Sequence, residues 1–298
     1  MSLAPHSFAV CAMVRETVDV LDVFARSYAQ SGAARIVLYY DGSETEAAPV
    51  EAAAPGGALA LEEKQEHVFR HALERNREDW LLLCDSDEIL QRGHLLGAAL
   101  AALPEDVPGI RLRNTEAVWG TGHDIEPAFS STYERHPFPW GKRRSALVAM
   151  LVYGRLWRQM RRGTAGHKLG KQLIRRGRTP DTVTNHFAIF DGVKTTFLDA
   201  YLEGPDLPYF RHYDAVSFAR WSEKWRVWHS ADTHAIRMSD ARLEQMTVIR
   251  AGLGTEAARQ AIRRYNQVGP WQRGVLSLLK LLDRIESSES NPPAPAPR

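Results

Sequence analysis

Short β-rich runs alternate with segments of helical spacing through the first third of the chain. Three runs have the length and apolar content of strands buried in a parallel sheet: Phe8–Val14, Arg35–Tyr40 and Trp80–Cys84. Between them, Val18–Gln30 and Leu59–Arg77 carry apolar residues at helical spacing. A helix near 93–103 and a strand at Ile110-Arg111-Leu112 continue the alternation. This alternation predicts an α/β fold with a single, mostly parallel sheet flanked by helices.

The pattern changes beyond about residue 215, where strand signals fade and helical spacing takes over. We predict an α/β domain over 5–215, a helical C-terminal extension over 216–290 and a disordered tail over 291–298, which is rich in Pro and Ala. Apolar residues recur at helical spacing near the end of the extension: Trp271, Val275, Leu278, Leu279, Leu282 and Ile285. Such a helix either docks onto the α/β domain or lies in the headgroup region of a membrane, and we expect docking.

Composition and length exclude several classes of protein. With 298 residues and 44% apolar content the chain can bury a large core, which excludes a disordered or fibrous protein. Its two cysteines, Cys11 and Cys84, fall inside predicted strands, which excludes a disulfide scaffold. No stretch reaches the roughly 18 apolar residues of a membrane span, and the N-terminus lacks the pattern of a secretion signal. We expect a soluble, cytoplasmic protein with at most peripheral membrane association.

Charge is nearly balanced overall but unevenly distributed. Lys and Arg number 38 against 36 Asp and Glu, yet the segment 142–178 holds twelve Lys or Arg residues and no acidic residue. We expect this basic block to bind an anionic partner, such as a diphosphate, an acidic glycan or a membrane, although a solvated loop explains most of its residues individually. Tyr153 and Trp157 raise the alternative of a single-stranded nucleic-acid platform. No recognition motif supports that alternative, and we expect no nucleic-acid partner.

A cluster of polar residues follows the third predicted strand. Asp85-Ser86-Asp87-Glu88 comes directly after Trp80–Cys84, and open α/β sheets bind ligands at the carboxyl ends of their strands. Asp85 and Asp87 have the chemistry to share Mg²⁺ or Mn²⁺ with phosphate oxygens. A solvated turn explains a bare Asp-x-Asp equally well, and Glu88 is also suited to cap the next helix.

Further motifs relate the chain to a known family. The matching segments are Val10–Thr17 with Leu21, Phe24 and Gly32, then Tyr40-Asp41-Gly42-Ser43, Trp80 with Asp85–Leu90, Gly120-Thr121-Gly122-His123, Lys171–Arg175, His186, His212-Tyr213, Ser217 and Lys224. Together they resemble the family-2-like glycosyltransferases with the GT-A fold, in the branch, related to family 92, that carries a Lys-Asn-Glu opening and an Asp-x-Asp-Glu-Phe metal motif. The resemblance covers about residues 8–225. The chain departs from this branch at Arg15-Glu16-Thr17, at Glu116 and at Asp214.

The resemblance implies a metal-dependent glycosyltransferase. Such an enzyme moves a sugar from a nucleoside-diphosphate donor, here expected to be UDP-linked, to a hydroxyl of a glycan or lipid-linked acceptor. By the family pattern, Asp87 binds Mn²⁺ or Mg²⁺, Asp85 acts through the metal or the donor ribose, and Asp41 contacts the nucleobase. A late histidine completes the metal shell, and we expect His212 rather than His186, although a buried structural histidine explains either. The expected donor-binding residues are Arg15, Asp41, Asp85, Lys171 and Arg175.

The residue that acts as catalytic base is the least determined part of the site. An inverting reaction needs a carboxylate within hydrogen-bond reach of the acceptor hydroxyl. Glu116 and Asp124, on either side of a glycine-containing turn, are the candidates, followed by Asp191 and Asp214. An ordinary surface carboxylate is the plainer explanation for each of them. A nucleotidyltransferase built on a similar sheet is the alternative class of enzyme.

One pair of histidines has the spacing of zinc ligands without the rest of a zinc motif. His67 and His71 stand four residues apart on a predicted helix, but Val68 occupies the position where a zinc protease needs Glu. We therefore expect a solvated pair.

Overall fold

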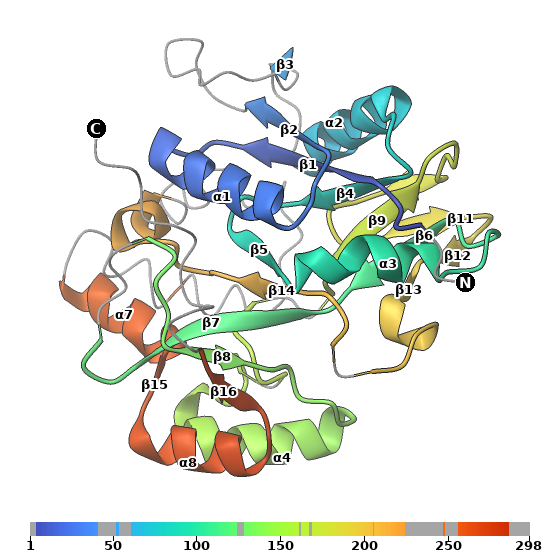
Figure 1. Cartoon of the computed structure of the whole chain (residues 1–298). Helices are drawn as coiled ribbons and strands as arrows, with labels where there is room; N and C mark the ends of the chain where they lie inside the picture. The colour runs from blue at the N-terminus through green and yellow to red at the C-terminus, as the bar shows by residue number, and fades with distance from the viewer. Residues whose placement is uncertain are drawn as a thin grey trace. The chain divides into compact units, whose positions relative to one another are not determined.

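The computed structural model describes residues 4–40, 52–53, 61–123, 128–160, 162–166, 169–204, 206–223, 247 and 256–285. The chain forms two compact units (Figure 1). The first comprises Met1–Asn114 and Leu169–Phe210, and the second comprises Thr115–Lys168 and Arg211–Asn291. The predicted tail and most of 224–255 lie outside the described residues, and the domain limits 5–215, 216–290 and 291–298 stay predictions.

The first unit is built on a seven-stranded sheet in the order β13-β6-β9-β4-β1-β2-β3. The strands are Phe8–Val14 (β1), Arg35–Tyr40 (β2), Ala52–Ala53 (β3), Trp80–Cys84 (β4), Gly109–Leu112 (β6), Lys171–Arg175 (β9) and Thr196–Phe197 (β13). β1, β2, β3 and β4 run parallel, whereas β9 is antiparallel to both β4 and β6. The predicted strands are confirmed, and so is the α/β class with a mainly parallel sheet flanked by helices.

Two helices lie on opposite sides of this sheet (Figure 1). α1 (Val18–Gln30) connects β1 to β2, and α2 (Leu61–Arg75) precedes β4, which lies on the other side of β1. Right-handed crossovers to the two neighbours of one strand place their helices on opposite faces. Val68 of α2 accordingly packs in one core cluster with Cys11 of β1. Cys11 and Cys84 are buried free thiols, as predicted.

After β4 the chain forms strand β5 (Glu88–Gln91), a 3₁₀ turn over Gly93–Leu95 and helix α3 (Leu96–Ala101), which confirms the helix predicted near 93–103. Glu88 begins β5 instead of capping that helix, so the capping role considered for it is wrong. A small antiparallel sheet completes the first unit in the order β10-β11-β12. Its strands are Thr182–Val183 (β10), Ala188–Phe190 (β11) and Val193–Lys194 (β12).

The second unit contains strands in the order β16-β8-β7-β14, with β15 paired to β7. Its elements are Asn114–Gly120 (β7), Tyr133–Arg135 (β8), Lys142–Tyr153 (α4), Tyr209–His212 (β14), Glu256–Asn266 (α7), Gln267–Val268 (β15), Pro270–Leu278 (α8) and Leu282–Arg284 (β16). The single sheet predicted for 5–215 is therefore wrong. Only Arg113 separates β6 from β7, so this connection has no room for the crossover helix that continues a parallel sheet.

The C-terminal helix is shorter than its apolar spacing predicts. α8 ends at Leu278, Lys280 adopts a left-handed conformation with φ 56°, and the chain then forms β16, which pairs antiparallel with β8. Leu282, counted in the predicted helical stripe, is therefore a strand residue. The segment packs in the core of the second unit, where Leu276 and Leu282 share a cluster with Val152 of α4, but it does not dock through the predicted stripe, because Trp271 and Leu278 are exposed.

Candidate active site

The acidic segment predicted at the end of β4 forms a tight turn between β4 and β5. The amide of Glu88 donates to the carbonyl of Asp85 over 3.2 Å, and the Asp85 amide donates to Oε2 of Glu88 over 3.2 Å. Ser86 and Glu88 are buried, whereas the Asp85 side chain is 33% exposed and Asp87 is half-buried. In this turn, the Glu88 side chain is therefore buried, whereas the side chains of Asp85 and Asp87 are at least partly accessible to solvent.

Lys171 anchors this turn from the neighbouring strand. β9 runs antiparallel to β4 and pairs Gln172 with Leu83, so Lys171 lies beside the carboxyl end of β4. Its ammonium donates to Oδ2 of Asp85 over 2.6 Å and lies 3.3 Å from Oε2 of Glu88. The lysine side chain has no exposed surface. A fully buried cation therefore holds two carboxylates of one turn.

A glycine sets the position of that lysine. Gly170, directly before β9, has φ 68°, and a Cβ at this position would lie 1.8 Å from the carbonyl oxygen of Leu112. Only glycine fits a left-handed residue in such close contact with another backbone segment. The turn that starts β9 thus depends on Gly170, and with it the placement of Lys171.

The ion pair keeps its members charged. Burial alone disfavours the ionised form of Asp85, but the Lys171 ammonium outweighs that effect and holds the pKa of Asp85 below its ordinary value. Burial likewise lowers the pKa of Lys171, and the attraction of Asp85 and Glu88 reverses that effect and raises the Lys171 pKa above its ordinary value. A carboxylate and an ammonium, rather than their neutral forms, therefore occupy the end of β4 at neutral pH.

Sequence reasoning missed a second partner of Asp85. The side-chain amide of Asn185, in the turn after β10, donates to the same Oδ2 atom over 2.6 Å. Its buried Oδ1 atom has no hydrogen-bond partner among the described residues. The only hint in the sequence is the position of Asn185 next to His186. Asn185 and Asp85 lie 100 residues apart in the chain, so no local sequence pattern links the turn after β10 to the end of β4.

The carboxylates of Asp85 and Asp87 could bind a divalent cation together with the phosphate groups of a substrate. The part of the chain that the structure describes gathers no group of three or more metal-ligating side chains. Mg²⁺ is commonly held through one or two carboxylates together with substrate phosphates. The contacts of the Asp85 carboxylate with described residues all go to Oδ2, so Oδ1 and the Asp87 carboxylate fit such a site. Ionised Asp85 has the hard, anionic oxygen that the cation prefers.

The histidines considered for this metal lie in different units. His186, in the first unit, interacts electrostatically with Asp85, and its Nδ1 lies 3.2 Å from the carbonyl oxygen of Gly170. His212 belongs to the second unit, where a Cβ on Gly166 would lie 3.1 Å from its ring. The expectation that His212 completes the metal shell stays a prediction, and His186 is the histidine that the first unit brings toward Asp85.

Of the predicted donor-binding residues, Arg15 and Arg175 lie at opposite ends of the sheet. Exposed Arg15 follows β1, whose Ala12 pairs with Cys84, so it lies at the same edge as Asp85. Next to it, Glu16 accepts a hydrogen bond from the Ser86 hydroxyl over 3.3 Å.

Arg175 pairs with Trp80, at the start of β4, and its guanidinium lies 4.6 Å from the centre of that indole ring. The four-residue offset from Lys171 to Arg175 spans about 13 Å along an extended strand. The donor-binding role expected for Arg175 stays a prediction, and β9 places this residue beside the start of β4 rather than beside Asp85. The family motif placed Lys171 and Arg175 in one strand, and the antiparallel direction of β9 takes Arg175 away from the acidic turn.

Glu116 is a structural ion-pair partner. Its carboxylate is buried against the guanidinium of Arg135, and it also accepts hydrogen bonds from the amides of Ala165, over 3.1 Å, and Gly166, over 2.8 Å. Three of these four donors bind Oε2 and one binds Oε1, so most of the contacts of this carboxylate hold local structure in the second unit. Its role as catalytic base stays a prediction, and the contacts that the structure shows for it are structural. The other first-choice candidate, Asp124, lies outside the described residues, as does Asp41.

The two second-choice base candidates, Asp191 and Asp214, lie in different units. Asp191 has φ 50° and lies, exposed, in the hairpin turn between β11 and β12. Asp214 is buried in the second unit. The basic block is divided as well, since Lys142–Lys168 belongs to the second unit and the rest of the block to the first.

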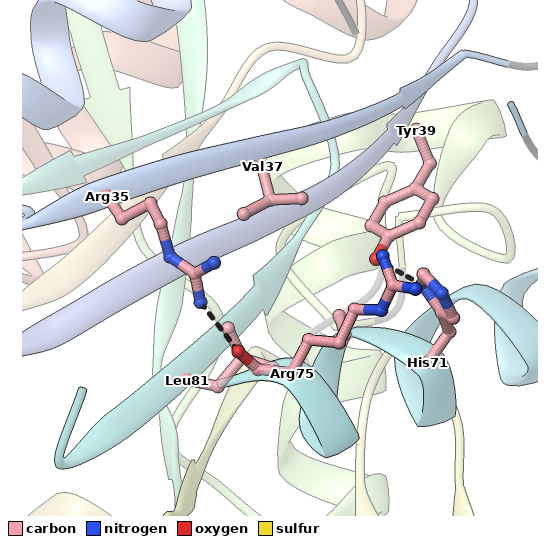
Figure 2. A pocket seen from close by; sticks show the side chains of 7 residues that line it. Arg35, Val37, Tyr39, His71, Arg75 and Leu81 are labelled. Carbon is pink, nitrogen blue, oxygen red and sulfur yellow. Dashed lines mark hydrogen bonds between the residues drawn. The ribbon is translucent and has the colours of Figure 1, made fainter. Parts of the chain in front are cut away.

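A shallow hollow elsewhere in the first unit contains none of the predicted site residues. Figure 2 shows it on the α2 side of β2, lined by Arg35, Val37, Tyr39, His71, Ala72, Arg75 and Leu81. His71 Nδ1 lies 2.7 Å from the hydroxyl of Tyr39, and His67 is exposed. His71 thus pairs with a tyrosine, and only His67 fits the expected solvated pair.

Comparisons with known proteins show only distant likeness. No family model matches the sequence, and no curated protein matches it. A solved mycobacterial protein aligns over 87% of this chain and 75% of its own, with 11% identity and a TM-score of 0.34. Mannosyl-3-phosphoglycerate synthase from Rubrobacter xylanophilus aligns over 57% of this chain and 54% of its own, with 17% identity and a TM-score of 0.29. At these values neither similarity establishes a function for this chain.

No helix in the described ranges is both long enough and apolar enough to cross a bilayer.

Proposed function

We propose that this protein is a glycosyltransferase that takes a sugar from a nucleoside-diphosphate donor, with a divalent cation at Asp85 and Asp87. The observation that carries the proposal is the buried Lys171 ammonium, which holds Asp85 ionised at the carboxyl end of β4 while that carboxylate stays partly exposed. This edge is where open α/β sheets bind their ligands. The resemblance of the surrounding motifs to GT-A glycosyltransferases supplies the class of reaction.

Each group at this edge suits one part of a nucleotide-sugar. A divalent cation, when bound, would act as a Lewis acid on the departing diphosphate. Lys171 and Asn185 hold Asp85 through its Oδ2 atom, and Oδ1 would be the oxygen that binds the cation. Arg15, at the same edge, supplies a positive charge for the diphosphate. Asp41 contacts the nucleobase, and UDP is the donor nucleotide that the family pattern favours.

Fewer observations bear on the acceptor substrate than on the donor. A hydroxyl of a glycan or of a lipid-linked sugar receives the transferred sugar, and Asp124 is the retained candidate for its base. Mn²⁺ or Mg²⁺ serves as the cofactor, with His186 or His212 as the further ligand. Cytoplasmic localisation belongs to the same proposal.

Product analysis tests this function. The purified protein is incubated with a panel of nucleotide-sugars and Mn²⁺, and release of nucleoside diphosphate is measured with and without EDTA. Asp87→Asn is expected to lower the release by about a hundredfold, because it removes a group that stabilises charge on the leaving phosphate. Asp106→Asn, an exposed carboxylate of the same unit, is the matched control and keeps full activity.

Two results would overturn the proposal. One is release that is insensitive to EDTA and to Asp87→Asn. The other is formation of pyrophosphate from nucleoside triphosphates under the same conditions, which identifies a nucleotidyltransferase.

A further inference from the structure

Helix α4 carries apolar side chains on both of its faces. Ala149 and Val152 are buried in the core of the second unit. Leu147, Met150 and Leu151 point outward and are 63%, 42% and 60% exposed. One apolar face is enough to fix a helix to its unit, so core packing does not account for the second one. Clustered exposed apolar side chains of this kind mark an interaction surface.

Helix α8 extends this apolar surface. α4 and α8 lie side by side (Figure 1). The indole Nε1 of Trp271 donates to the carbonyl oxygen of Leu151 over 3.2 Å, which places this 61% exposed ring at the end of α4. Leu278, 83% exposed, follows seven residues later on the same face of α8. We call Leu147, Met150, Leu151, Trp271 and Leu278 the α4–α8 patch.

Positive charge surrounds the α4–α8 patch. Arg143, Leu147 and Leu151 are spaced four residues apart and form one stripe on α4. Arg144, three residues before Leu147, lies beside that stripe and is also exposed. Exposed Arg155 and Arg158 follow the end of the helix. Neither α4 nor α8 contains an acidic residue.

We propose that the α4–α8 patch binds the surface of an anionic membrane. Trp271 and the exposed leucines enter the headgroup region, and the arginines contact lipid phosphates. Burial of apolar area and attraction to anionic lipid add together in such a surface contact. This inference concerns the second unit and does not depend on the proposed glycosyl transfer.

Charge argues against the other occupants of this surface. A symmetric contact between two copies would bring Arg143, Arg144, Arg155 and Arg158 of each copy together, and like charges at an interface are costly. A nucleic acid would satisfy the arginines but would leave the exposed leucines in water. An anionic bilayer satisfies both kinds of side chain.

Vesicle sedimentation of the full chain tests the proposal. The protein is spun with vesicles of phosphatidylcholine containing 30 mol% phosphatidylglycerol, and with vesicles of phosphatidylcholine alone. Binding is expected only to the anionic vesicles and is expected to weaken with salt. Arg143→Gln with Arg144→Gln should lower partitioning about thirtyfold, since each cation near the surface contributes about 1 kcal/mol. Leu147→Ser with Leu151→Ser should lower it about tenfold.

Matched controls separate the patch from charge in general. Arg176→Gln with Arg178→Gln removes two exposed cations of the same basic block in the first unit, and partitioning should be retained. Thermal melts establish that each variant is folded. Quenching of tryptophan fluorescence by brominated lipid should decrease in Trp271→Phe.

Three results would overturn the proposal. They are equal partitioning of the Arg143 and Arg176 double variants, binding to neutral vesicles alone, and a concentration-dependent dimer that Leu147→Ser with Leu151→Ser converts to monomer.

Discussion

The Lys171 ammonium lies 2.6 Å from Oδ2 of Asp85 and 3.3 Å from Oε2 of Glu88, and it has no exposed surface. Its attraction to two carboxylates compensates for the loss of hydration, and it fixes the turn that presents Asp85 and Asp87. Removing one partner of a buried ion pair strongly destabilises a protein, because the other charge stays buried without its counterion. The geometry of the acidic turn and the stability of the first unit therefore depend on the same side chain.

Lys171→Met is expected to lower the free energy of unfolding by about 3 kcal/mol, because it leaves Glu88 and Asp85 without their counterion. Urea unfolding followed by circular dichroism measures this loss. Arg178→Met, which changes an exposed cation a few residues further on, should change stability little. Equal stabilities of the two variants would show that the ion pair does not stabilise the first unit.

Acid should weaken the same contact. The folded-state pKa of Asp85 lies below its ordinary value of 3.8, so the unfolded chain takes up a proton first. The stabilisation is therefore complete above about pH 5 and is lost as the pH falls through the folded-state pKa. Urea unfolding between pH 6 and pH 3 should show a smaller loss of stability in Asp85→Asn than in the wild type. Asp106→Asn should follow the wild-type profile, and an Asp85→Asn profile as steep as the wild type contradicts the assignment.

The strands at the centre of the first unit could be predicted to the residue. β1 and β4 are buried on both faces, so they appear as continuous apolar runs that no amphipathic helix imitates. The carboxyl end of β4, and with it the acidic turn, follows from the same observation. Positions set by distant strand pairing could not be predicted. Lys171 lies beside Asp85 because β9 is antiparallel to β4, and the sequence carries no local signal of strand direction. The contact of Asn185 with Asp85 has no counterpart in the local pattern either.

The same limit applies to two further predicted site residues. Arg175 shares a strand with Lys171, but strand direction takes it to the far end of β4. Glu116 has the residue type of a base, but its burial against Arg135 comes from pairing between β7 and β8. Residue type and order gave no means to distinguish a buried ion-pair carboxylate from a reactive one.

Glu116→Gln is expected to destabilise the protein by about 3 kcal/mol, because it leaves the Arg135 guanidinium buried without its counterion. Activity per folded molecule should change little if the carboxylate serves only to hold Arg135 and the amides of Ala165 and Gly166 in place. Unfolding curves and turnover measured on the same samples test this expectation. Lost turnover with unchanged stability would restore Glu116 as a base.

The cation and the nucleotide should stabilise the first unit together. A ligand that binds only the folded state at a hundred times its Kd raises the free energy of unfolding by about 2.7 kcal/mol. We expect a shift of this order in the thermal melt with UDP and Mn²⁺, and none with UDP in EDTA. Asp87→Asn should abolish the shift, while Asp106→Asn keeps it. A shift that persists in Asp87→Asn would remove Asp87 from the proposed site.

The same substitution should have different effects at two leucines of α8 that lie two residues apart. At Leu276 it should lower stability, and at Leu278 it should weaken membrane binding. Leu276 is fully buried in the core of the second unit, whereas Leu278 is 83% exposed. Leu276→Ala should lower the free energy of unfolding by about 3 kcal/mol, because it removes buried apolar atoms from the core and leaves a cavity. Leu278→Ala should leave the free energy of unfolding nearly unchanged but weaken sedimentation with anionic vesicles. The reverse pattern of stabilities would mean that α8 docks through the face that the apolar spacing predicts, with Trp271 and Leu278 inward.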